Sequence, residues 1–315
     1  MCLRRLILAA SLLLAACAAP GVREVRNDPH LPRQQELAAT PFFSQERYQC
    51  GPAALATALT AIGIDTRPEQ LTPEIFIPGR QGSLQLEMLA AARRHGALAI
   101  RIPPRLDALL QEVAAGNNVV VLQNLGLSWI PAWHYAVVVG YDLDAGLIWL
   151  RSGTTRRQEM TLNTFQHTWS RAGHWGFVTV KPGDLPASAG MDAVTKALLT
   201  YEKSAPAARA KEAYAAAVHR WNDNLVLLMG LGNTAYLSGD MGTASNAFRR
   251  AIAVQPESAA AYNNLASTLL AQGSVDEAQD MADRALALAE KEPRLRPQIQ
   301  ETLNEIQRYR STRTR

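Results

Sequence analysis

A period of 34 residues in the last third of the chain is the feature that most restricts its fold. Apolar and small residues in the middle copy have counterparts of similar type 34 positions later and, less regularly, 34 positions earlier. Repeats of this length are typical of helical pairs that bury their apolar faces only by stacking on one another. The period therefore predicts a helical array, with an unrelated helical bundle as the alternative. The middle copy contains Leu228, Leu231, Gly232, Tyr236, Gly239, Ala244, Phe248, Ala251 and Pro256.

This pattern resembles the tetratricopeptide repeat. The resemblance implies about three repeats over residues 191–293, a capping helix and tail over 294–315, and a protein partner bound by the repeats. Residues 183–190, rich in Pro, Gly, Ser and Ala, are typical of a linker in front of the array.

Residues 1–17 are typical of a targeting segment. Arg4 and Arg5 precede an apolar run that is too short to span a bilayer permanently. The segment ends in Leu14-Ala15-Ala16-Cys17, which resembles the bacterial lipobox. The resemblance implies lipidation of Cys17 and a membrane anchor, with the outer membrane facing the periplasm as the expected location. Ordinary secretion with cleavage near Ala19 is the alternative. Residues 18–37 lack apolar periodicity and predict a flexible tether.

The charge balance gives no sign of a nucleic-acid partner. The formal net charge is +4, but without Arg4 and Arg5 the chain has 30 basic against 28 acidic residues. No basic and aromatic face stands out. Once the leader is removed and Cys17 lipidated, Cys50 has no cysteine partner and no cysteine cluster is left to bind zinc. We therefore expect no disulfide, no metal and no cofactor.

Cys50 opens a segment with strong helix-forming residues. Gly51 and Pro52 follow it, and the Ala-rich run predicts a helix to about Ile62, ended by Gly63. The helix N-terminus is expected to lower the pKa of the Cys50 thiol and so favour a nucleophilic thiolate. The alternative is a small buried cysteine without chemistry. A lone thiol in an oxidising compartment favours the catalytic interpretation.

The rest of residues 38–182 predicts an α+β domain. A helix capped by Ser83 comes first, and several strands follow, including a hairpin that turns at Asp144–Gly146. His134 is the histidine best placed to act as a base, because it opens an apolar strand, although a structural histidine at a strand end is the alternative.

Together, Gln45, the Cys50-Gly-Pro-Ala-Ala run and the His134-Tyr-Ala-Val-Val-Val-Gly strand resemble the papain-fold cysteine peptidases that process bacteriocin double-glycine leaders. The resemblance implies an α+β papain-like cysteine peptidase domain followed by an all-α tetratricopeptide-repeat domain. It also implies Cys50 as the nucleophile, His134 as its base and Gln45 as a donor to the oxyanion.

One expected residue is missing. The family has an Asp on the strand after the His, but here the orienting position falls between Ser152 and Thr154. Asp142 lies too far along the His134 strand to replace it, and Asn163 is a candidate for a supporting group. We predict Ser152 as the orienting residue.

Two functions remain open on this basis. The first is a membrane-anchored thiol peptidase or amidase that cleaves a protein or peptide substrate, while the repeats recruit a protein partner. The second is an inactive, peptidase-like adaptor. The sequence does not distinguish hydrolysis from acyl transfer by the same residues, and no motif identifies the substrate.

Overall fold

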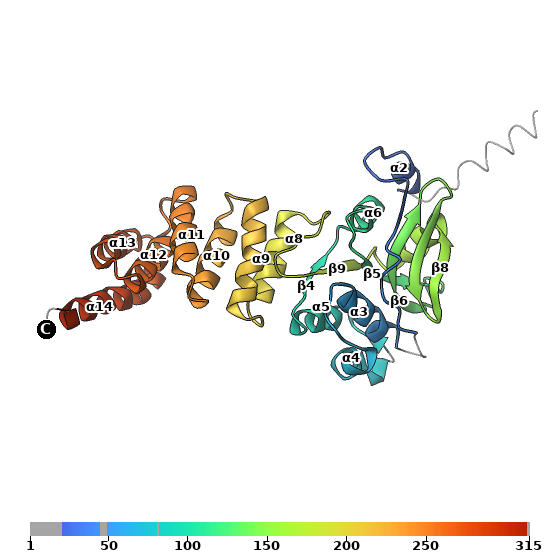
Figure 1. Cartoon of the computed structure of the whole chain (residues 1–315), viewed down its shortest axis with the longest axis horizontal. Coiled ribbons are helices and arrows are strands. Elements are labelled where there is room, and N and C mark those ends of the chain that lie inside the picture. The colour runs from blue at the N-terminus through green and yellow to red at the C-terminus, as the bar shows by residue number, and fades with distance from the viewer. Residues whose placement is uncertain (1–20, 45–48, 81, 314–315) are drawn as a thin grey trace, which may run out of the picture. The chain divides into compact units, whose positions relative to one another are not determined.

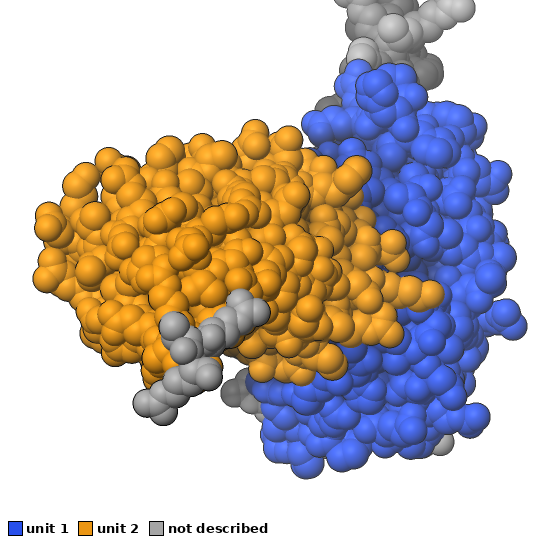
Figure 2. All heavy atoms as spheres, turned by 60° about the vertical axis from the view of Figure 1, so that its left-hand side comes forward, with its two compact units in different colours: residues 1–180, 186–193 blue, residues 181–185, 194–315 orange. Residues whose placement is uncertain are grey.

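The computed structural model describes residues 21–44, 49–80 and 82–313. The chain divides into two compact units, residues 1–180 with 186–193 and residues 181–185 with 194–315 (Figure 2). The first contains the sheet and the second the helical array, as the labels of Figure 1 show. The predicted α+β domain followed by an all-α domain is confirmed.

A mixed-length antiparallel sheet forms the centre of the first unit. The strands are ordered β4-β9-β5-β6-β7-β8, with β1 pairing with the far end of β6. Their bounds are β1 Gln34–Glu36, β4 Leu98–Arg101, β5 Val119–Asn124, β6 Trp133–Asp142, β7 Leu147–Ser152, β8 Thr155–Thr161 and β9 Gly176–Val180. A separate two-stranded sheet pairs β2 Phe76–Ile77 with β3 Gly82–Ser83 and encloses the short 3₁₀ turn Pro78–Arg80.

Both faces of the sheet are covered, which explains the unbroken apolar run of β5. Val119 and Val121 belong to a core shared with one group of helices, whereas Val120 and Leu122 belong to a core shared with another. Successive side chains of a strand point to opposite faces, so a strand buried on both sides has no polar alternation. The first group is α2 Val22–Arg26, α6 Leu106–Ala114 and α7 Leu162–Ser170, and the second is α3 Cys50–Ala61, α4 Pro68–Ile75 and α5 Gln85–Arg94.

The segment before the predicted domain is folded and does not form a free tether. Val22, Val25 and Leu31 are buried in the core beside α6. Strand β1 pairs with β6, with Glu36 opposite Gly140. The prediction of a flexible tether over residues 18–37 is therefore wrong for residues 21–37, because three scattered apolar residues and backbone pairing suffice to hold them. Residues 1–20, with the predicted leader and Cys17, lie outside the described residues.

The second half of the predicted linker, residues 183–190, is also held in place. Glu112 on α6 is fully buried, and its carboxylate accepts hydrogen bonds from the backbone N–H groups of Ala187 and Ser188, at 3.1 and 2.6 Å, and from the Ser188 hydroxyl. The Asn117 amide donates to the same carboxylate. These bonds fasten residues 186–193 to the first unit.

The second unit consists of helical pairs with the predicted period. The first helices of the pairs begin at Met191, Leu225 and Ala259, at intervals of 34 residues, and the second helices begin at Ala207, Met241 and Val275, at the same interval. The pairs are α8 Met191–Tyr201 with α9 Ala207–Arg220, α10 Leu225–Leu237 with α11 Met241–Val254, and α12 Ala259–Ala271 with α13 Val275–Leu288.

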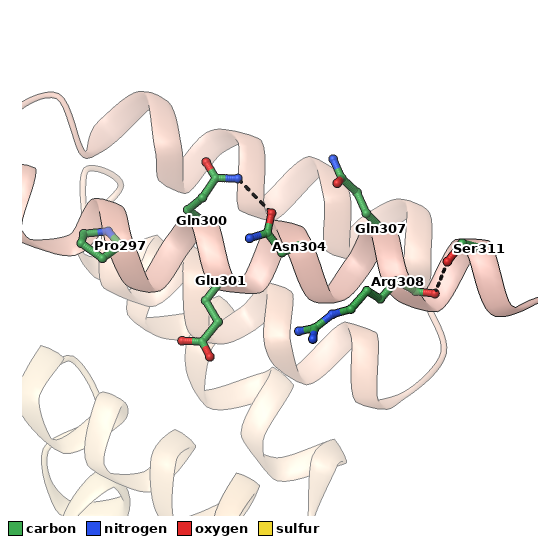
Figure 3. A pocket seen from close by; sticks show the side chains of 7 residues that line it. All are labelled: Pro297, Gln300, Glu301, Asn304, Gln307, Arg308 and Ser311. Carbon is green, nitrogen blue, oxygen red and sulfur yellow. Dashed lines mark hydrogen bonds between the residues drawn. The ribbon is translucent and has the colours of Figure 1, made fainter.

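Helix α14, Arg296–Arg313, follows a short 3₁₀ turn at Pro293–Leu295 and closes the array. Ile299, Leu303 and Ile306 are buried in the core of the repeats. The opposite face is polar and lines a hollow of about 860 Å³. Figure 3 labels its side chains and marks the hydrogen bond between Gln300 and Asn304. An apolar inner face and a polar outer face are what a terminal cap requires.

Among the described residues, no helix combines the length and the apolar character needed to cross a membrane.

Candidate active site

Helix α3 places Cys50 at its first residue. Gln49 is the N-cap residue and makes no side-chain capping bond. Gly51 follows, and a side chain there would collide with Ser83, whose Oγ is 2.4 Å from the position of a Cβ. Ser83 thus packs against the start of α3 and lies in β3, while Leu84 is the N-cap of α5. The predicted capping role of Ser83 is wrong, because Leu84 is the N-cap residue of α5 and the buried Ser83 hydroxyl makes no hydrogen bond to the helix.

The Cys50 thiol is half-buried, and burial raises its pKa above the ordinary value. The backbone N–H groups of Tyr135, Gly51 and Cys50 itself point towards the sulfur and lower the pKa, but by less than burial raises it. The expectation of a lowered pKa at the helix N-terminus is therefore wrong in its net direction. Desolvation of an anion outweighs the three donors, so the thiol is protonated at neutral pH.

His134 and Ser152 lie side by side on neighbouring strands. The His134 Nε2 is 2.8 Å from the Ser152 Oγ, and Ser152 is only 7% exposed. β6 pairs with β7 from Val137 opposite Arg151, and a shift in register follows between Val138 and Gly140. This irregularity brings Ser152 into reach of the ring. Ser152 thus occupies the position predicted for the orienting residue.

Burial lowers the pKa of the His134 imidazole. The residue that could oppose this effect is Ser152, whose hydroxyl carries no charge. A carboxylate at this position would stabilise the imidazolium, whereas a hydroxyl holds the ring without doing so. At neutral pH the imidazole is therefore uncharged and able to accept a proton.

Tyr135 joins the cysteine to the histidine strand. Its N–H points to the Cys50 sulfur, and its hydroxyl donates to the backbone oxygen of Ser83 at 3.1 Å. Burial raises the pKa of the Tyr135 phenol, with the nearby Cys50 as a further cause. The nucleophile candidate therefore lies beside the residue that follows the base candidate. The sequence contained no signal for this link, because a backbone N–H leaves no trace in residue type.

Of the other predicted residues, Gln45 lies outside the described residues. Thr154 is exposed in the β7–β8 turn, so Ser152 is the hydroxyl that reaches His134. Asp142 lies at the far end of β6, where its carboxylate accepts from the Ala145 N–H. Asn163 lines a hollow with residues of α2, so the proposed support for His134 from Asn163 is wrong.

No group of His, Cys, Asp and Glu side chains in the described part of the chain could hold a metal ion. The candidate residues at this site carry a thiol, an imidazole and a hydroxyl, which are groups used in nucleophilic acyl chemistry.

Comparison with known proteins finds a matching family for each of the two predicted domains. Residues 37–176 match the family described as Peptidase C39 like, and residues 235–297 match the tetratricopeptide repeat. No sequence among the curated proteins matches the chain. The chain therefore has a C39-like domain followed by a tetratricopeptide-repeat domain.

Solved structures similar to each part are known. A protein from Bacillus anthracis described as a C39-like peptidase is 18% identical, with 48% of this chain and 98% of that chain covered and a TM-score of 0.40. The Yersinia enterocolitica type III secretion chaperone SycD, in complex with a peptide of the translocator YopD, is 15% identical, with 38% and 94% covered and a TM-score of 0.36. The TPR2B domain of yeast Sti1 is 14% identical, with 38% and 97% covered and a TM-score of 0.36.

Proposed function

Because residues 37–176 form a C39-like domain, we propose that the protein is a thiol peptidase or amidase that uses Cys50 and His134. The observation that carries this proposal is the hydrogen bond between His134 and Ser152 on the strand whose next residue, Tyr135, points its N–H at the Cys50 sulfur. These contacts support the proposal because they link Ser152 to His134, and the strand of His134 to the start of α3.

The proposed reaction starts from neutral groups. With Nε2 bonded to Ser152, Nδ1 is the ring nitrogen that takes the thiol proton as the Cys50 sulfur attacks the carbonyl carbon. The imidazolium then returns that proton to the leaving amine, and a thioester remains on Cys50. Water, deprotonated by His134, attacks the thioester, which releases the acid and restores the thiol. Gln45 is proposed to donate to the oxyanion, as the resemblance implies.

The proposal extends to the rest of the chain. Cys17 is proposed to carry a lipid that holds the protein at the outer membrane on the periplasmic side, and the repeats are proposed to bind a protein partner or substrate. Support comes from the lipobox-like Leu14-Ala15-Ala16-Cys17 run and from the repeat match, since such repeats commonly bind peptides.

The first experiment compares wild type and Cys50→Ala on a library of internally quenched peptides. Wild type is expected to hydrolyse a subset and Cys50→Ala none, with the same thermal unfolding curve for both. Equal activity of the two proteins would refute the mechanism.

An adaptor without hydrolytic activity is the second candidate, and the uncharged Ser152 together with the raised pKa of Cys50 favours it. The variant Ser152→Asp separates the two. If neither wild type nor Ser152→Asp cuts any peptide in the library, although both bind peptides, the adaptor function is the correct one.

A further inference from the structure

The connection between β5 and β6 exposes a cluster of large apolar side chains. We name residues 125–133 the apolar hairpin. It contains no charged residue, and its exposed fractions are high for side chains of this kind. They are 48% for Leu125, 50% for Leu127, 76% for Trp129, 67% for Ile130 and 56% for Trp133.

The apolar hairpin is held in one conformation from within. Asn124, which is 2% exposed, accepts hydrogen bonds from the backbone N–H groups of Gly126 and Ala132 at 3.0 and 2.9 Å. Leu127 and Ile130 exchange backbone hydrogen bonds of 3.1 and 3.2 Å. The Arg171 guanidinium bonds to the backbone oxygen of Asn124 at 2.9 Å.

This framework has a consequence for the exposed side chains. Five backbone N–H groups between residues 125 and 132 donate to acceptors within residues 124–132, so the apolar side chains are displayed on an ordered support. Large apolar side chains gathered on an ordered surface mark a binding site in soluble proteins.

The apolar hairpin is continuous with the candidate active site. Trp133 directly precedes His134 on β6. A second pair of exposed apolar residues, Leu84 and Leu86, follows Ser83, which packs against Gly51 at the start of α3. The Tyr135 hydroxyl bonds to Ser83 and so fixes this segment to the histidine strand. Exposed apolar groups are therefore found next to the histidine and next to the cysteine.

We propose that the apolar hairpin is the substrate-recognition surface of this site, and that it takes a peptide with bulky apolar side chains close to the bond to be cleaved. The assignment of this surface to substrate binding rests on the proposed peptidase function. An uncharged surface selects against acidic and basic side chains, because they would lose hydration without gaining an ion pair. Trp129 and Trp133 offer large rigid faces, which are the side chains that most often dominate peptide binding.

A lipid surface is the less favoured occupant. Segments that lie in a membrane interface combine apolar residues with Lys or Arg that contact the headgroups. Residues 125–133 contain no Lys and no Arg. The position of Trp133 next to His134 also places the surface where a scissile bond would have to lie.

The test measures binding with the full chain carrying Cys50→Ala, so that it does not depend on hydrolysis. Fluorescently labelled peptides of equal length and charge, with either Leu and Phe or Gly and Ser at the four central positions, are titrated by fluorescence anisotropy. We expect the apolar peptides to bind at least tenfold more tightly. The double change Trp129→Ser with Ile130→Ser should weaken the binding of the apolar peptides at least tenfold. Glu69→Ser, a change at an exposed residue of α4 in the first unit, is the control and should leave it unaltered.

The inference is overturned if the double variant binds apolar peptides as well as its parent, or if both peptide sets bind equally. It is also overturned if the double change abolishes binding to phosphatidylglycerol–phosphatidylethanolamine vesicles, or concentration-dependent self-association, and leaves peptide binding intact. Failure of the proposed function gives a different result. In that case hairpin-dependent peptide binding persists, but wild type and Ser152→Asp cleave nothing.

Discussion

The Ser152 hydroxyl lies 2.8 Å from Nε2 of His134, at the position where the family resemblance led us to expect a carboxylate. A hydroxyl fixes the orientation of the ring, but it does not stabilise the positive charge that His134 acquires when it takes the thiol proton. With the pKa of His134 lowered and that of Cys50 raised, both by burial, the resting pair is uncharged. This relationship accounts for the first two predictions.

Ser152→Asp should make the site more active. An anion at hydrogen-bond distance raises the pKa of a neighbouring imidazole by about 1–3 units, and each unit is worth about tenfold in the stability of the imidazolium. We expect kcat/KM to rise about tenfold or more, with its acid limb shifted to higher pH, measured on any peptide that wild type cleaves. Ser152→Asn, an uncharged side chain of similar size, is the control. Equal effects of Asp and Asn would show that charge is not the missing element.

The Cys50 thiol should react slowly with alkylating agents at acidic and neutral pH. Only the thiolate reacts, and a raised pKa keeps the group protonated until the pH exceeds the ordinary value for a thiol. The rate of iodoacetamide labelling should therefore climb between pH 6 and 9 without a plateau. The measurement uses a chain with Cys2 and Cys17 replaced by Ser, and Cys50→Ala gives the background. A plateau reached below pH 7 would contradict the prediction and indicate a thiolate–imidazolium pair.

Glu112→Ala should destabilise the first unit and release residues 186–193. Without the carboxylate, the backbone N–H groups of Ala187 and Ser188 lose the acceptor that they share. Loss of such a shared buried acceptor costs about 3 kcal/mol or more in the free energy of unfolding. Urea unfolding and hydrogen exchange at residue 188 measure the two effects. Ser188→Ala, which removes one of the donors, should show a much smaller change. Slow exchange at residue 188 in Glu112→Ala would refute the fastening role.

Gly232→Ala should destabilise the repeats, because a Cβ at this position would lie 2.4 Å from the ring of Phe248. Overpacking of this kind lowers the free energy of unfolding by about 1–3 kcal/mol. Gly242→Ala is the matched control, since the atom nearest to its Cβ is 3.9 Å away and the residue is exposed on α11. There the better helix propensity of Ala should stabilise by about 0.5–1 kcal/mol. Thermal unfolding of both variants is the measurement, and equal shifts would contradict the packing argument.

Local patterns were sufficient for the order of the elements. The Ala-rich run after Cys50 predicts α3, because helix propensity and a C-terminal Gly63 act within one segment. The 34-residue period predicts the starts of the helical pairs, because each pair is specified by its own residues and its two neighbours. Counting through the hairpin turn at Asp144–Gly146 narrowed the orienting position to residues 152–154, but the register shift that selects Ser152 was not visible in the sequence.

Local patterns failed where distant segments meet. Val22, Val25 and Leu31 gave no periodicity, yet they complete a core made by α6 and β6. The sign of the pKa shift at Cys50 was also out of reach, because the helix N-terminus is a property of α3 whereas burial is a sum over everything packed around it. Nothing in the residue types pointed to Glu112 as the acceptor for residues 187 and 188.

The order of residues thus determined which segments become helices and strands and which side chains are chemically able to react, since both follow from neighbours along the chain. Only the tertiary structure decided that Tyr135 turns its N–H to the Cys50 sulfur, that Ser152 is the hydroxyl within reach of His134, and that burial raises the pKa of the Cys50 thiol. Desolvation and hydrogen-bond geometry depend on atoms brought together from positions far apart in sequence, and those effects exist only once the sheet and α3 have packed.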